Sequence, residues 1–476
     1  MVKIFHLIEH IVLILALGYY LILNLQWYNY RVKRVLLHHH NPYLHIFFFL
    51  LPLFIYFALR EHIWIFLIPF IIILYFWQKR LDKKLVFTPR VKRFFTILIF
   101  FTIFFDLLCL VKFNCNLFST ILPLISSLVL SSLIESFLFK VYKNEAKKKL
   151  EDISPTIVAI TASYGKTSIK NFLKDILSKK FKTYSTPRSV NTLGGIIKDI
   201  NESLPKDTQI YIVEAGARER GDIYEISTFL DHHYAVIGKI GPQHIEYFKS
   251  IENITATKLE LLSSKRLKKA FIYYEILVKD KDEFIKFGNN IKNIKSDLNG
   301  ISFDLELNGK IFNIKAPVLG EFNAINITAA ILVAKELKMD MSEILEAIKD
   351  LKPIEHRLQK IEANKKIIID DSFNGNLEGM ISSYELVKSF NGRKILVTPG
   401  VIESTKEINE KLAKKIDEVF DLVIITGKTN RAILDKNIKK AQKIILKDKK
   451  ELQQVLAKNT KEGDLILFSN DAPAYL

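Results

Sequence analysis

The sequence predicts an α/β protein in which a helical, apolar region precedes two domains built on mainly parallel sheets. Up to about residue 140 the chain is dominated by Phe, Ile, Leu and Tyr, whereas the remainder intersperses Lys, Glu and Asp. In this second part, short β-branched runs alternate with segments of helical periodicity, which is typical of strand–helix–strand units. At 476 residues the chain is also too long for one ordinary core. We therefore expect a transmembrane region over 1–148, a central domain over 149–355 and a smaller α/β domain over 356–476.

Five apolar runs in the first part are expected to be membrane-spanning helices. They fall at Ile4–Leu25, Leu44–Leu59, Ile63–Trp77, Phe94–Val111 and Leu117–Phe139. The first, fourth and fifth are long enough to cross about 30 Å of hydrocarbon at about 1.5 Å per residue. The second and third are short and are separated only by Arg60, Glu61 and His62, which leaves open a hairpin or a re-entrant pair. Four spans are the alternative to five.

The charges between these runs predict their orientation. Lys and Arg cluster after the first, third and fifth runs, whereas the other two connections are nearly uncharged. Basic loops stay on the cytoplasmic side, so the N-terminus is expected outside and everything after Lys140 in the cytoplasm. The protein is thus expected to be a multi-pass protein of the inner (cytoplasmic) membrane whose catalytic part is cytoplasmic.

Composition excludes several other classes. The net charge of +18 is in part this topology signal, and no basic motif interleaved with aromatic residues is present, so no nucleic-acid partner is expected. Only Cys109 and Cys115 occur, both in the apolar part, so neither a disulfide framework nor a cysteine metal site is expected. Asp106 lies within the fourth run without an evident basic partner, and we expect it to face a neighbouring helix.

A phosphate-binding loop is expected where the second part begins. Thr156–Thr161 (TIVAIT) is predicted to be a buried strand, and it is followed by Ala162–Ser168 (ASYGKTS) and a helical segment. In this context loop amides hold phosphates, Lys166 would reach the outer phosphates and the Thr167 hydroxyl would bind Mg²⁺. The general GxxxxGK[ST] pattern is not met, and the tripeptide alone also suits an ordinary strand-to-helix turn.

An acid follows another predicted strand of the same domain. Gln209–Val213 ends at Glu214, and ligands gather at the carboxyl ends of strands in open parallel sheets. A carboxylate there is a natural Mg²⁺ ligand, although a solvated strand-end Glu is the alternative. Tyr234–Ile240 is a further predicted strand, and Ile251–Leu262 a helix that carries Lys258. The central domain is therefore expected to be an ATPase domain of the P-loop type.

In order along the chain, these segments resemble the Mur ligase family, most closely the type that joins D-alanyl-D-alanine to UDP-N-acetylmuramoyl-tripeptide. The resemblance runs from about Thr156 to the C-terminus, and Ala162 replaces the first Gly of the family's TG-S/T-x-GKT loop. Further similar segments are Ser189–Gly195, Val213–Ile223, Leu319–Asn326, Glu355–Gln359, Asp370–Asn376 and Leu467–Pro473. Phe322 stands where the family usually has His, and His356 stands where the hinge motif G-R-x-Q has Gly.

The resemblance implies roles for individual residues. Three would be catalytic: Lys166, His244 and Lys258. Residues that would bind the nucleotide are Ser163, Gly165, Lys166, Thr167, Ser168, Asn323, Asn326, Arg357 and Asp371. Residues that would bind the other substrates are Asn191, Thr192, Asp370, Asn374 and Asn376. Two Mg²⁺ ions would be held by Thr167, Glu214, His244 and a carbamylated Lys258, since a carbamate turns a cation into an oxygen ligand suited to a hard ion.

Structural roles are the alternatives for some of these residues. Arg357 also suits a surface salt bridge, and His244 a capping or core histidine. Asn374 and Asn376 also suit turn positions after a strand.

The activity that the resemblance implies is ATP-dependent amide formation in peptidoglycan precursor synthesis. ATP would phosphorylate the terminal carboxylate of UDP-N-acetylmuramoyl-tripeptide, and the amine of D-Ala-D-Ala would attack the acyl phosphate. Members of this type usually carry an N-terminal domain that grips the UDP-sugar, whereas this chain has apolar runs there. Uridine must then bind elsewhere, or the substrate is a different, lipid-linked peptide. A non-catalytic membrane scaffold that recruits other cell-wall synthesis proteins is the remaining alternative.

Overall fold

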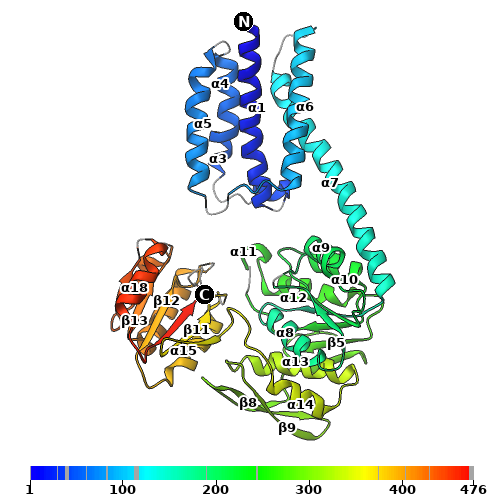
Figure 1. The fold of residues 1–476 in the computed structure, drawn as a ribbon, viewed down its shortest axis with the longest axis vertical. Helices are drawn as coiled ribbons and strands as arrows, with labels where there is room; N and C mark the ends of the chain where they lie inside the picture. Colours follow the sequence, from blue (N-terminus) through cyan, green and yellow to red (C-terminus); the bar gives the residue numbers. More distant parts are fainter. Residues whose placement is uncertain are drawn as a thin grey trace. The chain divides into compact units, whose positions relative to one another are not determined.

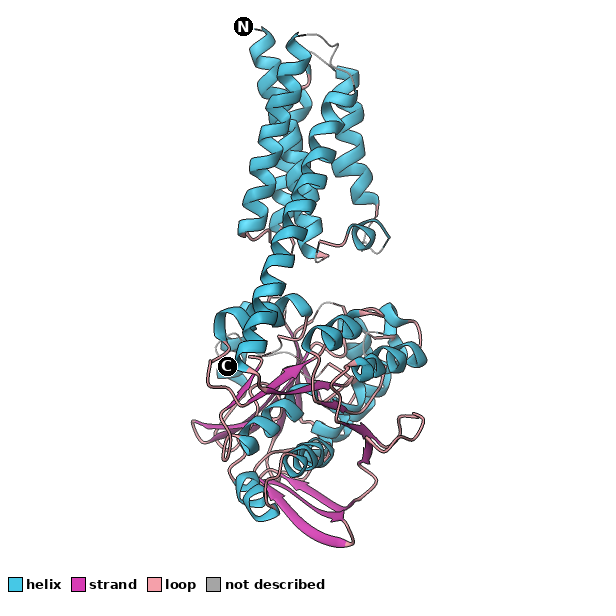
Figure 2. Cartoon of the chain, turned by 90° about the vertical axis from the view of Figure 1, so that its right-hand side faces the viewer, coloured by secondary structure: helices cyan, strands magenta, loops and turns pink. Residues whose placement is uncertain are grey.

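The structure is a computed structural model that describes residues 2–28, 30–37, 42–59, 62–81, 84–111, 117–188, 190–242, 245–373, 375–402, 404–427, 429–446 and 448–470. It divides into two compact units, Met1–Tyr142 and Lys143–Leu476 (Figure 1). Among the described residues, strands occur only in the second unit (Figure 2). Some residues named in the sequence analysis lie outside the described part: Arg60, Glu61, Cys115, Ser189, His244, Asn374 and Pro473.

The first unit is helical, and a helical segment lies over each of the five apolar runs. Its elements are α1 (Val2–Trp27), α2 (Val32–Leu37), α3 (Tyr43–His45), the π-helical η1 (Ile46–Leu50), α4 (Leu51–Leu59), α5 (Trp64–Lys79), α6 (Pro89–Val111) and α7 (Leu117–Ile153), which extends beyond the unit. Two stretches, Leu7–Trp27 and Thr120–Ile153, are long and apolar enough to cross a membrane, a test that buried core helices and signal sequences also pass. Tyr43–Leu59 and Trp64–Lys79 are shorter apolar helices.

Helix α1 forms the centre of this unit. Its Leu13, Ile14 and Leu17 are fully buried, and α1 packs on α5 and α6. Asp106 of α6 faces α1, as expected, where its carboxylate lies 2.7 Å from Nδ1 of His10. His10 is the partner that the sequence analysis missed, because the register between two helices far apart in sequence is not a local property.

The central part of the second unit is a parallel six-stranded sheet in the order β2-β3-β1-β4-β5-β6. Its strands are β1 (Thr156–Thr161), β2 (Thr183–Ser185), β3 (Ile210–Glu214), β4 (Tyr234–Ile237), β5 (Lys269–Tyr273) and β6 (Phe284–Phe287). The accompanying helices are α8 (Lys166–Leu177), α9 (Leu193–Ser203), α10 (Asp222–Leu230), α11 (Ile245–Phe248), α12 (Ile251–Leu259), the 3₁₀ turn η3 (Glu260–Ser263), α13 (Asn323–Glu336) and α14 (Met341–Lys349). Because β1 pairs with both β3 and β4, a crevice is expected outside the carboxyl ends of these three strands.

A three-stranded antiparallel sheet was not predicted from the sequence. It contains β7 (Ile291–Asp297), β8 (Gly300–Leu307) and β9 (Lys310–Ala316) in that order. Asn308 and Gly309 join β8 to β9 with φ values of 50° and 72°, the left-handed torsions that a tight hairpin turn requires.

The last part of the second unit is a second six-stranded sheet, in the order β10-β11-β15-β12-β13-β14. Its strands are β10 (Gln359–Ala363), β11 (Lys366–Asp371), β12 (Lys394–Thr398), β13 (Leu422–Ile425), β14 (Gln442–Ile445) and β15 (Leu465–Ser469). Helices α15 (Leu377–Lys388), α16 (Lys406–Val419), α17 (Arg431–Asn437), α18 (Leu452–Asn459) and the 3₁₀ turn η4 (Lys449–Glu451) connect them. Only β10 runs antiparallel to its neighbour, so the mainly parallel α/β class is confirmed for both sheets.

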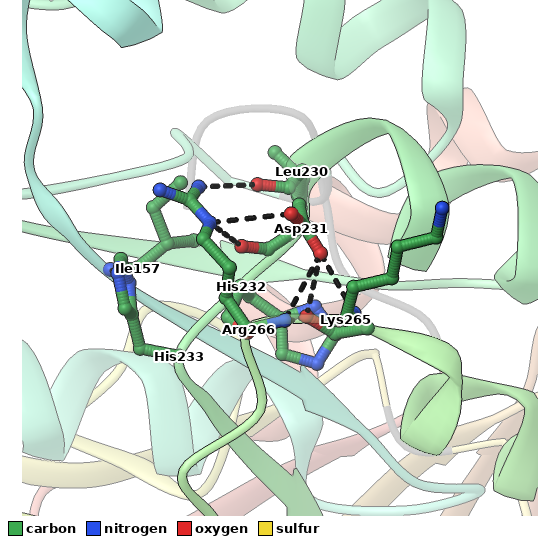
Figure 3. A network of polar contacts seen from close by, with 8 residues as sticks. Ile157, Leu230, Asp231, His232, His233, Lys265 and Arg266 are labelled. Atoms are coloured by element: carbon green, nitrogen blue, oxygen red, sulfur yellow. Dashed lines mark hydrogen bonds and ion pairs between the residues drawn. The ribbon is translucent and has the colours of Figure 1, made fainter.

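A polar network joins the segments at the amino-terminal ends of strands in the central sheet (Figure 3). The Asp231 carboxylate accepts hydrogen bonds from the backbone N–H groups of Lys265 (2.7 Å) and Arg266 (3.2 Å). The Arg266 Nε donates to the Asp231 carbonyl oxygen at 2.8 Å, and Nδ1 of His233 accepts from the Ile157 N–H at 3.1 Å. These bonds hold the segments that enter β1, β4 and β5.

His232 in this network makes stability depend on pH. Its side chain is fully buried, and this burial lowers its pKa from 6.5 to about 4. Between these two values the unfolded chain binds a proton that the folded chain does not, so stability falls as the pH falls and the loss is complete below about pH 4. We expect His232 to account for a loss of about 3 kcal/mol over this window.

The measurement is the thermal unfolding midpoint of the detergent-solubilised chain between pH 7 and pH 4.5. The variant His232→Leu is expected to lose less stability on acidification than the wild type, since it has no imidazole to protonate. Parallel pH profiles of wild type and variant would contradict this role of His232.

Candidate active site

The predicted phosphate loop forms at the carboxyl end of β1. Gly165 is the N-cap residue of α8 and has a φ of 83°, a left-handed torsion that glycine adopts without steric cost. A Cβ atom at this position would also collide with the side-chain oxygen of Asn326 on α13. The loop is tied to the segment after β4, because the Ser163 N–H donates to the Lys239 carbonyl (2.9 Å) and the Ser163 hydroxyl to the Gly241 carbonyl (3.0 Å).

Three of the predicted site residues lie together beside this loop. The Thr167 hydroxyl donates to Oε2 of Glu214 at 2.9 Å, and Nδ2 of Asn191 donates to Oε1 at 3.1 Å. Glu214 ends β3, next to β1, and only 2% of its surface is exposed. The segments around Thr167, Asn191 and Glu214, which are far apart in sequence, therefore converge at the strand ends where the parallel sheet predicts a ligand site.

Lys170 is a part of this site that the sequence analysis missed. It lies one turn after Lys166 on α8 and is buried. Its ammonium is 3.6 Å from Oε2 of Glu214 and donates to the carbonyl oxygens of Thr186 (2.8 Å) and Arg188. Burial lowers the pKa of Lys170, and the charge of Glu214 opposes this shift. Glu214 therefore has a buried counter-charge on one side and the phosphate loop on the other.

Lys258 lies near the end of α12 with 4% of its surface exposed. The pKa of Lys258 is held well below its usual value. Burial of the side chain is the main cause, and repulsion by the Lys166 ammonium is the second. Glu260 fixes this end of the helix, because its carboxylate accepts from the N–H groups of Gly221 (2.8 Å) and Tyr224 (3.0 Å) at the start of α10. A lowered pKa increases the share of the neutral, nucleophilic amine, which carbamate formation requires.

Lys166 and Arg357 contribute positive charge to the same place. The Lys166 ammonium donates to the carbonyl oxygens of Ala162 (2.7 Å) and Ser163 (3.2 Å) within its own loop. Burial lowers the pKa of Lys166, and the charges of Glu214 and Arg357 influence it as well. Arg357 itself donates from Nη1 to the Phe373 carbonyl at 2.5 Å. The charges of Lys166, Arg357 and Glu214 are therefore close enough to influence one another.

A cavity of about 290 Å³ lies next to Arg357. Asn323, Pro353 and Lys360 also line it. Asn323 is fixed there, since its Nδ2 donates to the Leu319 carbonyl (2.7 Å) and its Oδ1 accepts from Asn326 (2.9 Å). A volume of this order suits a small planar group such as a nucleobase.

His356, where the related hinge motif has glycine, keeps a glycine-like backbone. Its φ is 63°, and its ring is held by Asp370, whose Oδ2 lies 2.6 Å from Nδ1. The ring also packs on Phe373, with centroids 4.6 Å apart. The contacts with Asp370 and Phe373 offset a left-handed torsion that costs a non-glycine residue about 1–2 kcal/mol.

The other predicted ligands have structural partners in this conformation. Oδ1 of Asp370 accepts from the Ser372 N–H (3.0 Å), and Oδ1 of Asp371 accepts from the Leu358 N–H (3.3 Å). Thr192 caps α9 and Asn376 caps α15 through their side-chain oxygens. Ser168 is buried on α8. Roles in substrate or nucleotide binding stay predictions for these residues.

The residues at the loop fit a nucleotide with Mg²⁺. The Thr167 hydroxyl and Glu214 carboxylate are the oxygen donors that this ion prefers, and a loop glycine without Cβ leaves backbone N–H groups open at a helix start. Within the described ranges, no group of three or more His, Cys, Asp or Glu is placed to hold a metal. Mg²⁺ in nucleotide sites usually binds one or two protein oxygens and completes its six ligands with water and phosphate oxygens.

Two family models match the second unit. The model for the Mur ligase middle domain matches residues 160–334, and the model for the Mur ligase glutamate ligase domain matches residues 356–470. The boundary between them lies at the His356 segment.

Similar curated and solved proteins carry related names. A UDP-N-acetylmuramoyl-tripeptide–D-alanyl-D-alanine ligase of Buchnera aphidicola from Acyrthosiphon pisum is 30% identical over 269 residues, which are 52% of this chain and 58% of that ligase. The Bacillus subtilis ligase of the same name is 25% identical over 63% of this chain and 68% of its own. The crystal structure of MurF ligase from Thermotoga maritima in complex with ADP has a TM-score of 0.59 at 25% identity, over 70% of this chain and 80% of that chain.

These similarities leave part of the relatives unmatched. This chain spans 58% and 60% of the length of two Buchnera ligases. Both Mur ligase domain types nevertheless occur in their order along the second unit, on the fold that the solved ligase shares. This chain belongs to the Mur ligase family.

Proposed function

We propose that this chain is an ATP-dependent amide ligase that adds D-alanyl-D-alanine to UDP-N-acetylmuramoyl-tripeptide. The observation that carries the proposal is the group formed by Thr167, Glu214 and Asn191 beside the Gly165 loop. The names of the related ligases supply the substrate class. An ADP-bound relative with the same fold supports ATP as the phosphoryl donor.

The chain's own residues would hold the reacting groups and balance their charge. Amide formation in water requires an activated carboxylate, so the γ-phosphoryl of ATP passes to the tripeptide carboxylate, and the amine of the dipeptide then displaces phosphate from the acyl phosphate. The loop amides and Lys166 stabilise the negative charge on the transferred phosphoryl group. Arg357, on the segment that leads to β10, would close over the nucleotide.

Two Mg²⁺ ions are part of this proposal. Thr167 and Glu214 would hold one, and a carbamate on Lys258 together with His244 would hold the other. When bound, the ions neutralise phosphate charge and orient the phosphate oxygens. The neutral amine of Lys258 forms the carbamate by attacking CO₂ and releasing one proton.

Replacing Lys258 is the direct test of this modification. Lys258→Met keeps the length and removes the amine, and it is expected to lower Mg²⁺-dependent ADP release about 10- to 100-fold. In ¹³C NMR with labelled bicarbonate, the wild type should show a carbamate signal that Lys258→Met lacks. Lys265→Met, whose side chain is exposed, is the matched control and should keep both signal and activity. A carbamate signal that survives in Lys258→Met would contradict the assignment.

ADP release by the purified full chain tests the ligase proposal. With ATP and Mg²⁺, release is expected only when both UDP-N-acetylmuramoyl-tripeptide and D-Ala-D-Ala are present. No release with this pair would remove the substrate assignment. Release with a lipid-linked muropeptide instead would favour a Mur-like ligase that acts on a lipid-linked peptide.

We also propose that the first unit lies in the cytoplasmic membrane with five spans and the ligase residues on the cytoplasmic side. Its helices expose large apolar side chains that a water-soluble bundle would bury, among them Phe54, Ile68, Phe100 and Phe137. Lys and Arg gather in the connections after α1 and α5 and in the last turns of α7. The chain should remain in the membrane pellet after carbonate extraction, and its recovery in the soluble fraction would refute this placement.

A further inference from the structure

A polar groove lies on the first unit, between the start of α6 and the middle of α7. Its volume is about 610 Å³. Arg90 and Arg93 line it from α6, and Ser132, Glu135 and Ser136 from α7. Of the other described cavities and clusters, the one beside Arg357 belongs to the active site, whereas this groove contains charged groups that the ligase reaction does not use.

Arg90 is held in place while its donors stay open. Its guanidinium carbon lies 3.5 Å from the centroid of the Tyr30 ring, which fixes the group by stacking. Its Nε is 4.0 Å from Oε2 of Glu135, too far for a hydrogen bond. The Arg90 side chain forms no hydrogen bond with any described residue, and it is 35% exposed. Five N–H donors of a positioned cation therefore remain available at the groove.

Arg93 and Glu135 leave the groove with an excess of positive charge. Nε (2.8 Å) and Nη2 (2.6 Å) of Arg93 both donate to one oxygen of Glu135, and Nη1 has no partner within the described ranges. Two guanidinium groups thus face one carboxylate. Ser132 and Ser136, one turn apart on α7, add exposed hydroxyl groups. More donors than acceptors and a net positive charge are what an anionic oxygen ligand requires.

The surroundings of the groove are apolar on the side of the helices. Leu138 and Phe139 belong to its lining, and Leu133 and Phe137 of α7 are 63% and 67% exposed. A small soluble anion would leave this apolar surface exposed, whereas the acyl chains of a lipid would cover it. In the proposed orientation α6 begins at the cytoplasmic surface, where lipid headgroups lie and basic side chains attract anionic ones.

We propose that this groove binds the phosphate headgroup of an anionic membrane lipid between Arg90 and Arg93, with the lipid chains along the apolar faces of α6 and α7. The proposal rests on the membrane placement of the first unit. It does not depend on the ligase substrates.

The test is lipid selectivity of the full chain in nanodiscs of equal parts phosphatidylglycerol and phosphatidylcholine, with retained lipid measured by native mass spectrometry. The wild type should retain phosphatidylglycerol preferentially. Arg90→Gln and Arg93→Gln should each weaken this retention about tenfold, the effect of losing one charged hydrogen bond. Lys92→Gln, between them on α6 but not in the groove, is the matched control and should retain the lipid as the wild type does.

Glu135→Gln separates a lipid site from a structural ion pair. It removes the carboxylate that competes for Arg93, so retention of phosphatidylglycerol should increase. Equal retention of both lipids by the wild type, or weaker retention in Glu135→Gln, would overturn the proposal. Complete displacement of the lipid by millimolar glycerol phosphate would instead identify a soluble anion as the ligand and also overturn it. Failure of the chain to enter nanodiscs would refute the membrane placement while leaving the ligase proposal standing.

Discussion

Lys166→Ala is expected to lower the rate of ADP release at saturating substrates by about 10²- to 10³-fold, the usual effect of removing one positioned donor from developing negative charge. Lys166 is the first residue of α8, and its ammonium spans the loop between the carbonyl groups of Ala162 and Ser163. In the proposed mechanism this charge faces the transferred phosphoryl group. Burial lowers the pKa of Lys166, which means that its charged form does not stabilise the fold. Removing the Lys166 side chain should therefore not reduce the thermal unfolding midpoint.

The matched control is Lys174→Ala, on the exposed side of the same helix. It removes the same charge and the same side-chain length without touching the loop. Lys174→Ala should keep wild-type activity. Retention of more than about a tenth of the activity by Lys166→Ala would show that the loop does not act on phosphate as proposed.

Glu214→Gln is expected to abolish Mg²⁺-dependent activity and to destabilise the fold by about 3 kcal/mol. The amide removes the proposed Mg²⁺ ligand, and it also leaves the buried ammonium of Lys170 without its carboxylate, now 3.6 Å away. A buried charge that loses its partner is costly, although the carbonyl groups of Thr186 and Arg188 still accept from Lys170.

The double variant Glu214→Gln, Lys170→Met separates the two effects. It removes the uncompensated charge, so most of the lost stability should return, while activity should not, because the Mg²⁺ ligand is still missing. Thermal unfolding midpoints and ADP release across a Mg²⁺ titration measure the two quantities. Lys174→Met in place of Lys170→Met should restore nothing. A double variant as unstable as Glu214→Gln would show that Lys170 and Glu214 are not coupled.

Local patterns predicted the parts of the site that depend on neighbouring residues. The strand Thr156–Thr161, the Gly165 turn and the helix after it follow one another in sequence, so their order and chemistry were visible there. The antiparallel sheet was missed although Asn299-Gly300 and Asn308-Gly309 are hairpin signals. That failure was one of interpretation.

Other features depend on contacts between distant segments. Lys170 looks like an ordinary surface lysine in a lysine-rich helix, and only the approach of Glu214 and Thr186 makes its burial favourable. His10 and Asp106 likewise meet through helix packing. His356 was noticed as a departure from glycine, but its left-handed torsion and its bond to Asp370 required the structure.

The close approach of Gly165 to Asn326 couples the position of the phosphate loop to that of α13. No side-chain volume separates the two, so there is no slack to absorb a displacement of the helix. Asn326 is bonded to Asn323, which lines the cavity beside Arg357. A molecule bound in that cavity would therefore displace the phosphate loop through α13 without contacting the loop. An inhibitor could in this way slow phosphoryl transfer from outside the phosphate site.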